Sequence, residues 1–554
     1  MKCHPIVSHL PRLPRFAPWS AVSSALLGIA IPALLLVACG GPTLAVPATT
    51  NATLNLLATL PTTLDPTQDS GGAAIFLDSV FSGLERYDAN GDLEPDLAQQ
   101  VSISPKRTVY TFTLNPHARF HNGDPVTAQS IVYAINRAAD PAHGSPVAGD
   151  YLGVIQGVTE RLAGKTNAVS GVTAVDASTV RFTLTHPDDA FLAKLTFPLA
   201  FALDQRTVEA GGANWWQHPN GSGPFRLTAW QPATQATLER YRGFYGPAPH
   251  VGQVILHDPA AMADPPTAYA QGKLALLPLP PTAQNMAAFL NPQATVPPAV
   301  RQAFHIFDLP SLEYLAINRA AAPFDDVNVR RALNLALDKP LLVTAALGGD
   351  GWPAGAILPP QFPGYQRNTA FYPFNLAAAR AAFAASRYAG TTPTVTLASG
   401  ERLASGQPGP LTSTIAAMLQ QNLGWHVTLV FTPDSTIDTL LAQGKSPGNI
   451  VLTGWQADYT DPSDFLDLLF HSGRSTNLTH YSNAQVDQLL GQAIQATDSH
   501  QRIDLYRQAQ MLILRDAPIV PLFFERDFVL LDPTVTSLPL LPDGSFDLRD
   551  ARIG

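Results

Sequence analysis

The sequence contains little cysteine and few charged residues. Of its 554 residues 2 are cysteine, Cys3 and Cys39, and 14% are Asp, Glu, Lys or Arg. For the reasons given below we expect Cys3 to be removed with an export signal and Cys39 to carry lipid. No thiol would then remain for a disulfide, a metal ion or a nucleophile. A chain of this length can bury a sufficient core without disulfides, so their absence is compatible with an oxidising compartment.

The motifs of several enzyme classes are absent as well. There is no His-Glu-x-x-His zinc motif and no Gly-x-Ser-x-Gly nucleophile motif. The Gly-Lys-Thr and Gly-Lys-Ser sequences at 164–166 and 444–446 resemble the end of a phosphate-binding loop. That loop needs a glycine where this chain has Thr159 and Thr439. We therefore expect a protein that is not an enzyme and that holds neither a metal ion nor a cofactor.

Positive charge is scarce. The formal net charge is −9 at pH 7, and loss of the leader would remove Lys2, Arg12 and Arg15 and no acidic residue, which lowers it to −12. Such a charge argues against nucleic acid as a partner, because nucleic-acid binding depends on basic surfaces. The negative charge does not exclude small cationic or zwitterionic ligands.

The first 38 residues are typical of an export signal. The ionised side chains before Cys39 are all basic, and the apolar run from Ala25 to Ala38 is too short to span a bilayer comfortably. The sequence Leu-Val-Ala-Cys-Gly at 36–40 resembles the bacterial lipobox, in which the cysteine is acylated and begins the mature chain. We expect lipidation at Cys39, a flexible tether over 39–50, and a domain outside the cytoplasmic membrane. The alternatives are an uncleaved signal anchor or an ordinary secreted protein.

The remainder is expected to be a folded α/β protein. Apolar residues make up 46% of the chain, and no internal repeat or second membrane segment is visible. Periodicity predicts helices over 74–87, 127–137, 327–337, 376–385, 412–423 and 499–515. It predicts strands over 53–57, 108–114, 172–185, 394–397, 426–431, 449–453 and 517–524. In the second half of the chain the predicted helices and strands alternate, which is typical of an α/β domain.

The stretch Gly-Trp-Gln-Ala-Asp-Tyr-Thr-Asp-Pro at 454–462 is the strongest candidate site. It follows the apolar run 449–453, so Trp455 and Asp458 are expected just past the end of a buried strand. A ligand ammonium there would pair with Asp458 while its chain lies on the indole, and such a pair is worth roughly 4 kcal/mol at an effective dielectric of 20. The alternative is that Asp458 or Asp461 caps a turn and Trp455 is core.

Eleven short motifs, in order over nearly the whole mature chain, carry a resemblance. They include Leu-Asp-Pro at 64–66, Pro-Asp-Leu-Ala at 95–98, Phe-His-Asn-Gly-x-Pro at 120–125, Gly-Ser-Gly-Pro-Phe at 221–225, Pro-Phe-Asp-Asp at 323–326 and Gly-Trp-x-x-Asp-Tyr-x-Asp-Pro at 454–462. Each is weak alone, but in this order they resemble the extracellular solute-binding proteins, family 5, which feed peptide and nickel ABC importers.

This resemblance implies an α/β fold of two lobes around a cleft, the periplasmic-binding-protein-like fold of type II, cluster C, with an inserted third subdomain. Lobe I is expected over 51–84, 201–308 and 524–554, the inserted subdomain over 85–200, and lobe II over 309–523. Because the chain crosses between the lobes twice, we expect a hinge, and a ligand held between the lobes would stabilise the closed form.

The resemblance also implies a site. Asp458 would bind the α-ammonium of a peptide, with Trp455 and Tyr459 beside it. The backbone at Gly454 and Gln456 would pair with the peptide as a strand. The loop Ser70, Gly71 and Gly72 would approach from the other lobe. The chain departs from some oligopeptide-binding relatives, which place an arginine for the peptide carboxylate shortly before the tryptophan, so peptide length and the carboxylate partner stay open.

Three functions follow from this pattern. The first is a monomeric, lipid-anchored receptor that captures peptides and delivers them to an ABC permease and ATPase complex. The second keeps the fold and transport but changes the cargo to a nickel chelate, a sugar or an opine. The third is a cell-envelope lipoprotein without transport. A carboxylate at 458 favours the first, because the other cargoes need not present an ammonium.

Overall fold

A computed structural model describes residues 51–554 apart from 70–71, 280–288, 290–295, 368–369 and 401–406. Ala48–Gly554 forms one compact unit. The expected signal, Cys39 and the tether lie outside the described residues, as do Ser70 and Gly71. Within the described ranges, no helix has the length and apolar character needed to cross a membrane.

The first sheet joins segments that are far apart in the sequence. Its strand order is β1-β10-β9-β8, and β1 runs parallel to β10, with Thr53 opposite Gln253. The strands are β1 (Thr53–Leu57), β8 (Phe225–Gln231), β9 (Gln235–Arg240) and β10 (Gln253–His257). The predicted strand 53–57 and the strand pair after 221–225 are thus confirmed, and the chain returns to the same sheet after an insertion.

The helix predicted over 74–87 is wrong in its second half. Helix α1 spans Ala74–Val80, and Glu85–Tyr87 forms strand β2, which pairs with β3 (Leu93–Pro95). The helix stops because the backbone of the glycine-rich segment at 221–223 runs against its last turn, where the Gly223 N–H donates to the Val80 carbonyl at 2.9 Å. Phe81 then adopts an extended conformation.

The inserted segment builds its own sheet and core. Its strand order is β4-β5-β7-β6, and all neighbouring strands are antiparallel. The strands are β4 (Ala98–Ile103), β5 (Val109–Leu114), β6 (Val172–Ala174) and β7 (Thr179–Thr183). Helix α2 (Ala128–Ala138) follows its N-cap Thr127, which forms a capping box with Ser130.

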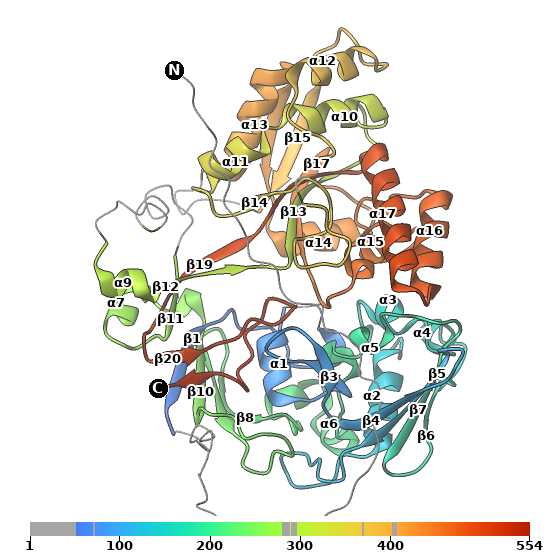
Figure 1. The fold of residues 1–554 in the computed structure, drawn as a ribbon, viewed down its shortest axis with the longest axis vertical. Helices are drawn as coiled ribbons and strands as arrows, with labels where there is room; N and C mark the ends of the chain where they lie inside the picture. Colours follow the sequence, from blue (N-terminus) through green and yellow to red (C-terminus); the bar gives the residue numbers. More distant parts are fainter. Residues whose placement is uncertain (1–50, 70–71, 280–288, 290–295, 368–369, 401–406) are drawn as a thin grey trace, which may run out of the picture. The chain divides into compact units, whose positions relative to one another are not determined.

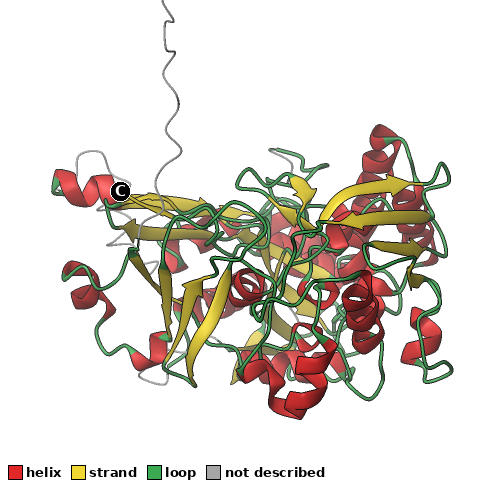
Figure 2. Ribbon diagram, turned by 90° about the horizontal axis from the view of Figure 1, so that it is seen from below, coloured by secondary structure: helices red, strands yellow, loops and turns green. Residues whose placement is uncertain are grey.

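The largest sheet has the order β14-β18-β13-β17-β15-β16. Its strands are β13 (Ser311–Ile317), β14 (Trp352–Pro353), β15 (Thr394–Ser399), β16 (His426–Phe431), β17 (Ile450–Gln456) and β18 (Ile519–Phe524). Every residue of β18 is buried, because the strand lies inside the sheet between β14 and β13. Figure 2 shows helices beside the strands of the molecule. Strand β17 is longer than predicted. Trp455 is therefore inside the strand rather than past its end, which corrects the expectation.

Helices flank these sheets. The predicted helices 127–137, 327–337, 376–385, 412–423 and 499–515 are confirmed and differ only at their end residues. The helices are α1, α2, α3 (Ala148–Leu152), α4 (Val158–Leu162), α5 (Phe191–Lys194), α6 (Gln205–Gly211), α7 (Pro265–Ala270), α9 (Pro298–Ala303), α10 (Val327–Ala336), α11 (Lys339–Ala346), α12 (Leu376–Ala384), α13 (Pro410–Leu423), α14 (Asp434–Ala442), α15 (Pro462–Phe470), α16 (Ala484–Gln495) and α17 (Ser499–Asp516).

Two crossing strands connect the first sheet region with the largest sheet. Strand β12 (Phe304–Asp308) leads into β13, and β18 leads into β19 (Arg526–Leu531). Strands β12 and β19 lie side by side in a three-stranded sheet of order β11-β19-β12, in which β11 is Leu276–Pro278 (Figure 1). The chain ends in a small pair, β20 (Val535–Ser537) with β21 (Arg552–Ile553). The expected double crossing is present, and the two segments support each other as a hinge.

The close approach at Gly221 predicts a large stability effect. A Cβ at Gly221 would overlap the backbone carbonyl oxygen of Val80, whereas a Cβ at Gly491 in α16 meets no heavy atom within 4 Å. Gly221→Ala should lower the free energy of unfolding by about 1–3 kcal/mol through overpacking. The matched change Gly491→Ala should raise it by about 0.5–1 kcal/mol, because alanine has the higher helix propensity. Urea unfolding of both variants checks this, and equal effects would contradict the packing of 221–223 on α1.

Candidate ligand site

A short loop between β17 and α15 carries Asp458. Strand β17 ends at Gln456, and α15 begins at Pro462 with Asp461 as its N-cap, whose carboxylate accepts from the Ser463 N–H at 2.9 Å. Asp461 also pairs with Arg502 at 2.7 Å. The capping role that the sequence left open therefore belongs to Asp461. Asp458 has no part in the cap, so its carboxylate is available for another interaction.

The side chain of Asp458 is partly buried and faces the inserted subdomain. Its Oδ2 accepts a hydrogen bond from the hydroxyl of Tyr151, which lies in α3 and is 1% exposed. Burial, with a smaller contribution from the charges of Asp543 and Asp69, raises the pKa of Asp458 to about 8, although the Tyr151 hydrogen bond opposes the shift. Tyr151 supplies a hydrogen bond but no positive charge, so an incoming cation would favour the ionised form of this carboxyl group.

Trp455 and Asp464 hold the loop in place. The Trp455 indole Nε1 donates to Asp464 Oδ2 at 3.0 Å, and the Asp458 N–H lies 3.4 Å from both oxygens of the same carboxylate. Burial, followed by the charge of Asp458, raises the pKa of Asp464 well above its ordinary value. Trp455 also packs against the core of the inserted subdomain and that of the largest sheet. Its indole therefore positions the loop as well as bordering the site.

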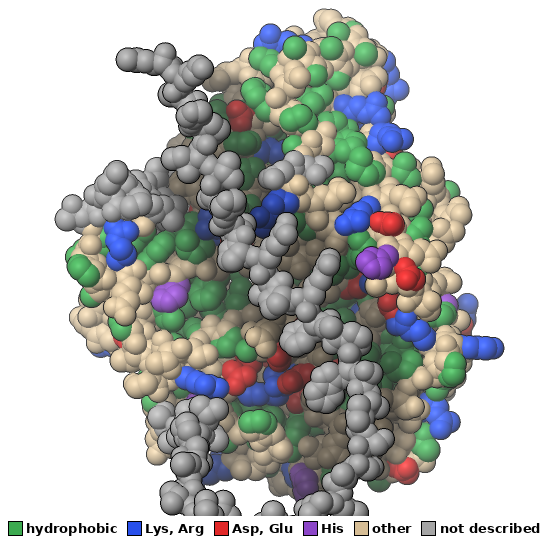
Figure 3. All heavy atoms as spheres, viewed as in Figure 1, with side chains coloured by type: hydrophobic (Ala, Val, Ile, Leu, Met, Phe, Trp, Pro, Cys, Tyr) green, Lys and Arg blue, Asp and Glu red, His purple; other side chains and the backbone are tan. Residues whose placement is uncertain are grey.

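Asp458 lines a cavity of about 70 Å³, here named the Asp458 cavity. Residues from lobe I, the inserted subdomain and the C-terminal segment form its wall. They are Asp69, Ala74, Asp78, Ser79, Phe81, Ser82, Gly83, Glu85, Arg86, Tyr87, Asp96, Thr196, Phe197, Pro198, Phe201, Pro224, Asp458, Leu541, Asp543, Phe546, Asp547, Leu548 and Arg549. On the face drawn in Figure 3, acidic side chains gather beside basic ones in the lower half.

A second cavity of about 920 Å³, the β17 cavity, follows the strand itself. Thr453, Gly454, Trp455 and Gln456 line it, together with residues of β18 and β19. Gln456 Nε2 donates to the backbone carbonyl of Asp543, a residue of the Asp458 cavity. The two cavities thus lie on either side of this bridge between β17 and the C-terminal segment.

One side of β17 lacks a complete strand partner. Strand β13 pairs with β17 along its length, from Ile317 opposite Ile450 to Ser311 opposite Gln456. On the other side β15 pairs only with Ile450 and Val451. Among the described residues, the β15-facing side from Leu452 to Gln456 has no strand on it. This is the geometry that adding an extended peptide requires.

The other predicted residues occupy different environments. A Cβ at Gly454 would overlap the carboxylate of Glu313, so only glycine leaves that side chain in place. Gly72 is exposed, and Ser70 and Gly71 lie outside the described residues. Tyr459 is 0% exposed, with its hydroxyl 3.3 Å from Ser463 Oγ and its ring edge-to-face with Tyr151 at 6.1 Å. Tyr459 supports the loop from the core and reaches neither cavity.

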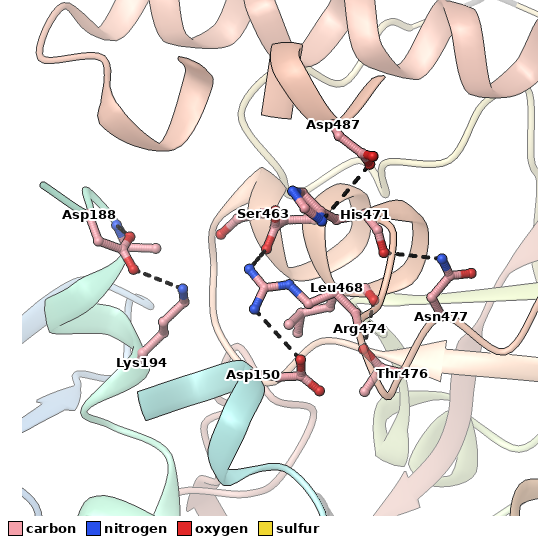
Figure 4. A network of polar contacts seen from close by, with 12 residues as sticks. Asp150, Asp188, Lys194, Ser463, Leu468, His471, Arg474, Thr476, Asn477 and Asp487 are labelled. Carbon is pink, nitrogen blue, oxygen red and sulfur yellow. Dashed lines mark hydrogen bonds and ion pairs between the residues drawn. The ribbon is translucent and has the colours of Figure 1, made fainter. Parts of the chain in front are cut away.

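Several polar contacts join the inserted subdomain to lobe II. Arg474 Nη1 lies 3.6 Å from Asp150 Oδ1, and Ser475 donates to the other oxygen of that carboxylate (Figure 4). Arg502 lies 3.8 Å from Asp189, and the Thr460 N–H donates to the Tyr87 hydroxyl at 3.0 Å. These contacts lie on the side of the cleft where Tyr151 meets Asp458, so the two parts are in contact around the site.

The comparisons with known proteins agree on one family. The profile of the bacterial extracellular solute-binding proteins, family 5 middle, matches residues 92–477, more than half of the chain. The chain is 30% identical over 497 residues to the probable deoxycholate-binding periplasmic protein YgiS of Escherichia coli strain K12, covering 87% of this chain and 89% of that one. It is 28% identical over 469 residues to the periplasmic oligopeptide-binding protein OppA of the same strain, covering 82% and 83%.

Solved structures show the same fold. The Escherichia coli murein tripeptide binding protein MppA superposes with a TM-score of 0.79 at 24% identity, covering 92% of this chain and 99% of that one. An MppA structure described as the unliganded open form superposes with a TM-score of 0.69 at 25% identity, covering 91% of this chain and 98% of that one. The expected two-lobed α/β fold with an inserted subdomain and a hinge is confirmed, whereas the residue bounds of the lobes stay a prediction. The chain belongs to the bacterial extracellular solute-binding proteins of family 5.

Proposed function

We propose that this protein is the substrate-binding lipoprotein of an ABC importer, which captures peptides by their amino terminus and delivers them to a membrane permease. The observation that carries the proposal is the Asp458 carboxylate, which lines a cavity and accepts from the neutral Tyr151 hydroxyl. A peptide ammonium would supply the positive charge that this carboxylate lacks. Hydrogen bonds to charged groups contribute about 1.5–3 kcal/mol each.

The rest of the peptide would lie along β17. Its main chain would pair with Gly454 and Gln456 on the side that β15 leaves uncovered, and its side chains would enter the β17 cavity. Because main-chain groups are common to all peptides, this pairing tolerates many side chains. The Asp458 end would then set the direction of the peptide, with its amino terminus at the loop.

Closure of the lobes would couple binding to transport. A ligand shifts the ratio of closed to open molecules from 1:99 to 99:1 only if it prefers the closed form by about 5.5 kcal/mol. Contacts from both sides of the cleft can supply such a preference, since the Asp458 cavity takes residues from lobe I, the inserted subdomain and lobe II. A lipid anchor at Cys39 and the tether over 39–50 would keep the monomeric domain near the permease, outside the cytoplasmic membrane.

A peptide fits this site better than the other cargoes weighed from the sequence. YgiS is described as binding deoxycholate, which is an anion, and an anion next to the acidic wall of the Asp458 cavity would be repelled. A sugar would gain no charge interaction from Asp458. The proposal of a cell-envelope lipoprotein without transport would leave both cavities without a use.

Loss of the Asp458 charge should weaken peptide binding strongly. Asp458→Asn keeps the size of the side chain and an acceptor for Tyr151 but leaves the ligand ammonium unpaired, so the dissociation constant should rise by the equivalent of roughly 2 to 4 kcal/mol. Asp504→Asn is the matched control, because that carboxylate is exposed and, among the described residues, its one salt bridge is with Arg507 at 3.2 Å. Calorimetric titration with a tripeptide measures both, and an unchanged affinity for Asp458→Asn would make Asp458 a purely structural residue.

Peptide binding should depend on pH in a defined direction. Burial raises the pKa of unliganded Asp458 from 3.8 to about 8. Between these two pH values the unfolded chain has lost this proton while the folded protein still holds it, so the folded state becomes less stable as the pH rises. A bound ammonium favours the ionised form, so binding should release a proton at pH 6.5, and affinity should rise toward pH 8. Above that pH the peptide α-amino group, with a pKa of about 7.7–8.0, loses its own charge.

Proton release is measured by titration calorimetry in buffers of different ionisation enthalpy. Asp458→Asn should remove most of it, whereas the neighbouring titratable groups Asp69, Asp464, Asp543 and Tyr151 remain in that variant. Equal proton release by the wild type and Asp458→Asn would contradict the assignment of the cation-binding carboxylate.

Membrane attachment should depend on one sulfur atom. Cys39→Ser removes the thiol that lipid would modify and leaves the remaining sequence intact. The full-length protein should sediment with membranes in an expressing bacterium, and the variant should appear in the soluble extracytoplasmic fraction or retain its uncleaved leader. Membrane association that survives this change would point to a signal anchor instead of a lipoprotein.

A further inference from the structure

The Asp458 cavity holds more carboxyl groups than one ammonium can pair with. Among the described residues its wall contains two arginines and seven carboxylates, which are Asp69, Asp78, Glu85, Asp96, Asp458, Asp543 and Asp547. Both arginines are already engaged. Arg549 lies 3.3 Å from Asp96, and Arg86 pairs with Glu94 and lies 3.9 Å from Asp547. Within the described part of the chain neither forms a salt bridge with Asp458, Asp78 or Asp543.

The carboxylates of the wall lie within one another's field. Burial raises the pKa of Asp78 well above its ordinary value, and Asp543, Asp547 and Asp69 add to the shift. Asp543 and Asp69 also raise the pKa of Asp458. Asp78 on α1 and Asp543 in the C-terminal segment therefore face the same space as Asp458, although they come from different parts of the sequence.

Glu85 gives an independent indication of a ligand. Its side chain lines the same cavity and is 3% exposed, and its Oε1 has no hydrogen-bond partner among the described residues. A buried carboxylate oxygen without a donor destabilises the protein. A donor that arrives with the ligand removes that cost, and a cationic donor removes the most.

An organic cation suits this wall better than a metal ion. Within the described ranges no group of three or more His, Cys, Asp or Glu side chains is arranged to hold a metal ion. The cavity is also lined by the rings of Phe81, Tyr87, Phe197, Phe201 and Phe546. Aromatic faces accommodate the methylene stem of a lysine or arginine and attract its charged end.

We propose that the Asp458 cavity selects peptides whose first residue carries a positively charged side chain, such as lysine, arginine or ornithine. The α-ammonium binds Asp458, and the side-chain cation binds among Asp78, Asp543 and Glu85. This inference rests on the proposed function and deepens it, because it names the chemical class of the first residue. A chain of net negative charge with an acidic cavity would then discriminate against peptides that begin with an acidic residue.

The β17 cavity agrees with a cationic cargo. Among the described residues its wall contains one arginine and four carboxylates, Glu313, Asp350, Glu525 and Asp527. That arginine, Arg526, is engaged with Asp308 at 3.1 Å and lies 4.5 Å from the centroid of the Trp352 ring. The acidic character therefore continues along the strand, away from the amino-terminal end.

Three tripeptides that differ only at the first residue test the proposal. Lysine and norleucine have side chains of similar length and differ in charge, and glutamate reverses the charge. We expect Lys-Ala-Ala to bind the purified full-length protein at least about tenfold more tightly than norleucine-Ala-Ala, and Glu-Ala-Ala to bind most weakly. The advantage of lysine should shrink as salt is added.

Asp78→Asn in the same assay locates the subsite. The ratio of norleucine to lysine dissociation constants should fall toward one in this variant, while the control Asp504→Asn retains the wild-type ratio. Equal affinity of the wild type for the lysine and norleucine peptides overturns the inference and leaves the proposed function standing. Failure of all three peptides to bind overturns both. The wild-type comparison decides the matter even where Asp78→Asn does not fold.

Discussion

A partly buried carboxyl group that receives a hydrogen bond from the protein but no positive charge is the constraint on which the rest of the structure depends. Asp458 accepts from the Tyr151 hydroxyl and lies beside other carboxylates, so burial and repulsion both disfavour its ionised form. The fold keeps this arrangement because its neighbours are fixed. Asp461 caps α15, and Asp464 accepts from the indole of Trp455. The loop therefore holds a carboxylate whose charge only a ligand completes.

The two-lobed architecture makes that constraint useful. Tyr151 belongs to the inserted subdomain, Asp458 to lobe II, and Asp543 to the C-terminal segment that returns beside lobe I, so the site is assembled from parts that a hinge can separate. Strands β12 and β19 cross together and support each other by pairing. A ligand that satisfies Asp458 strengthens the contact between those parts and so favours closure.

The sequence predicts local features well and distant ones poorly. Most helices and the Trp-x-x-Asp loop follow from periodicity and an ordered set of motifs. The end of α1 was misplaced, because residues 221–223 stop that helix from about 140 residues away in the sequence. Tyr151, Asp78 and Asp543 were missed for the same reason. Nothing near them in the sequence distinguishes them from solvated side chains, and only tertiary packing brings them to Asp458.

The most direct test of the central claim is native mass spectrometry of the chain from Gly40 onward, purified without a tag and without added ligand. The account predicts co-purified peptides that are released on denaturation and that carry a free amino terminus, for which a carboxylate at 458 is the partner. A bound metal chelate, sugar or bile acid in their place, or a cleft that is empty after purification from a peptide-rich medium, would contradict the claim that Asp458 exists to bind an ammonium.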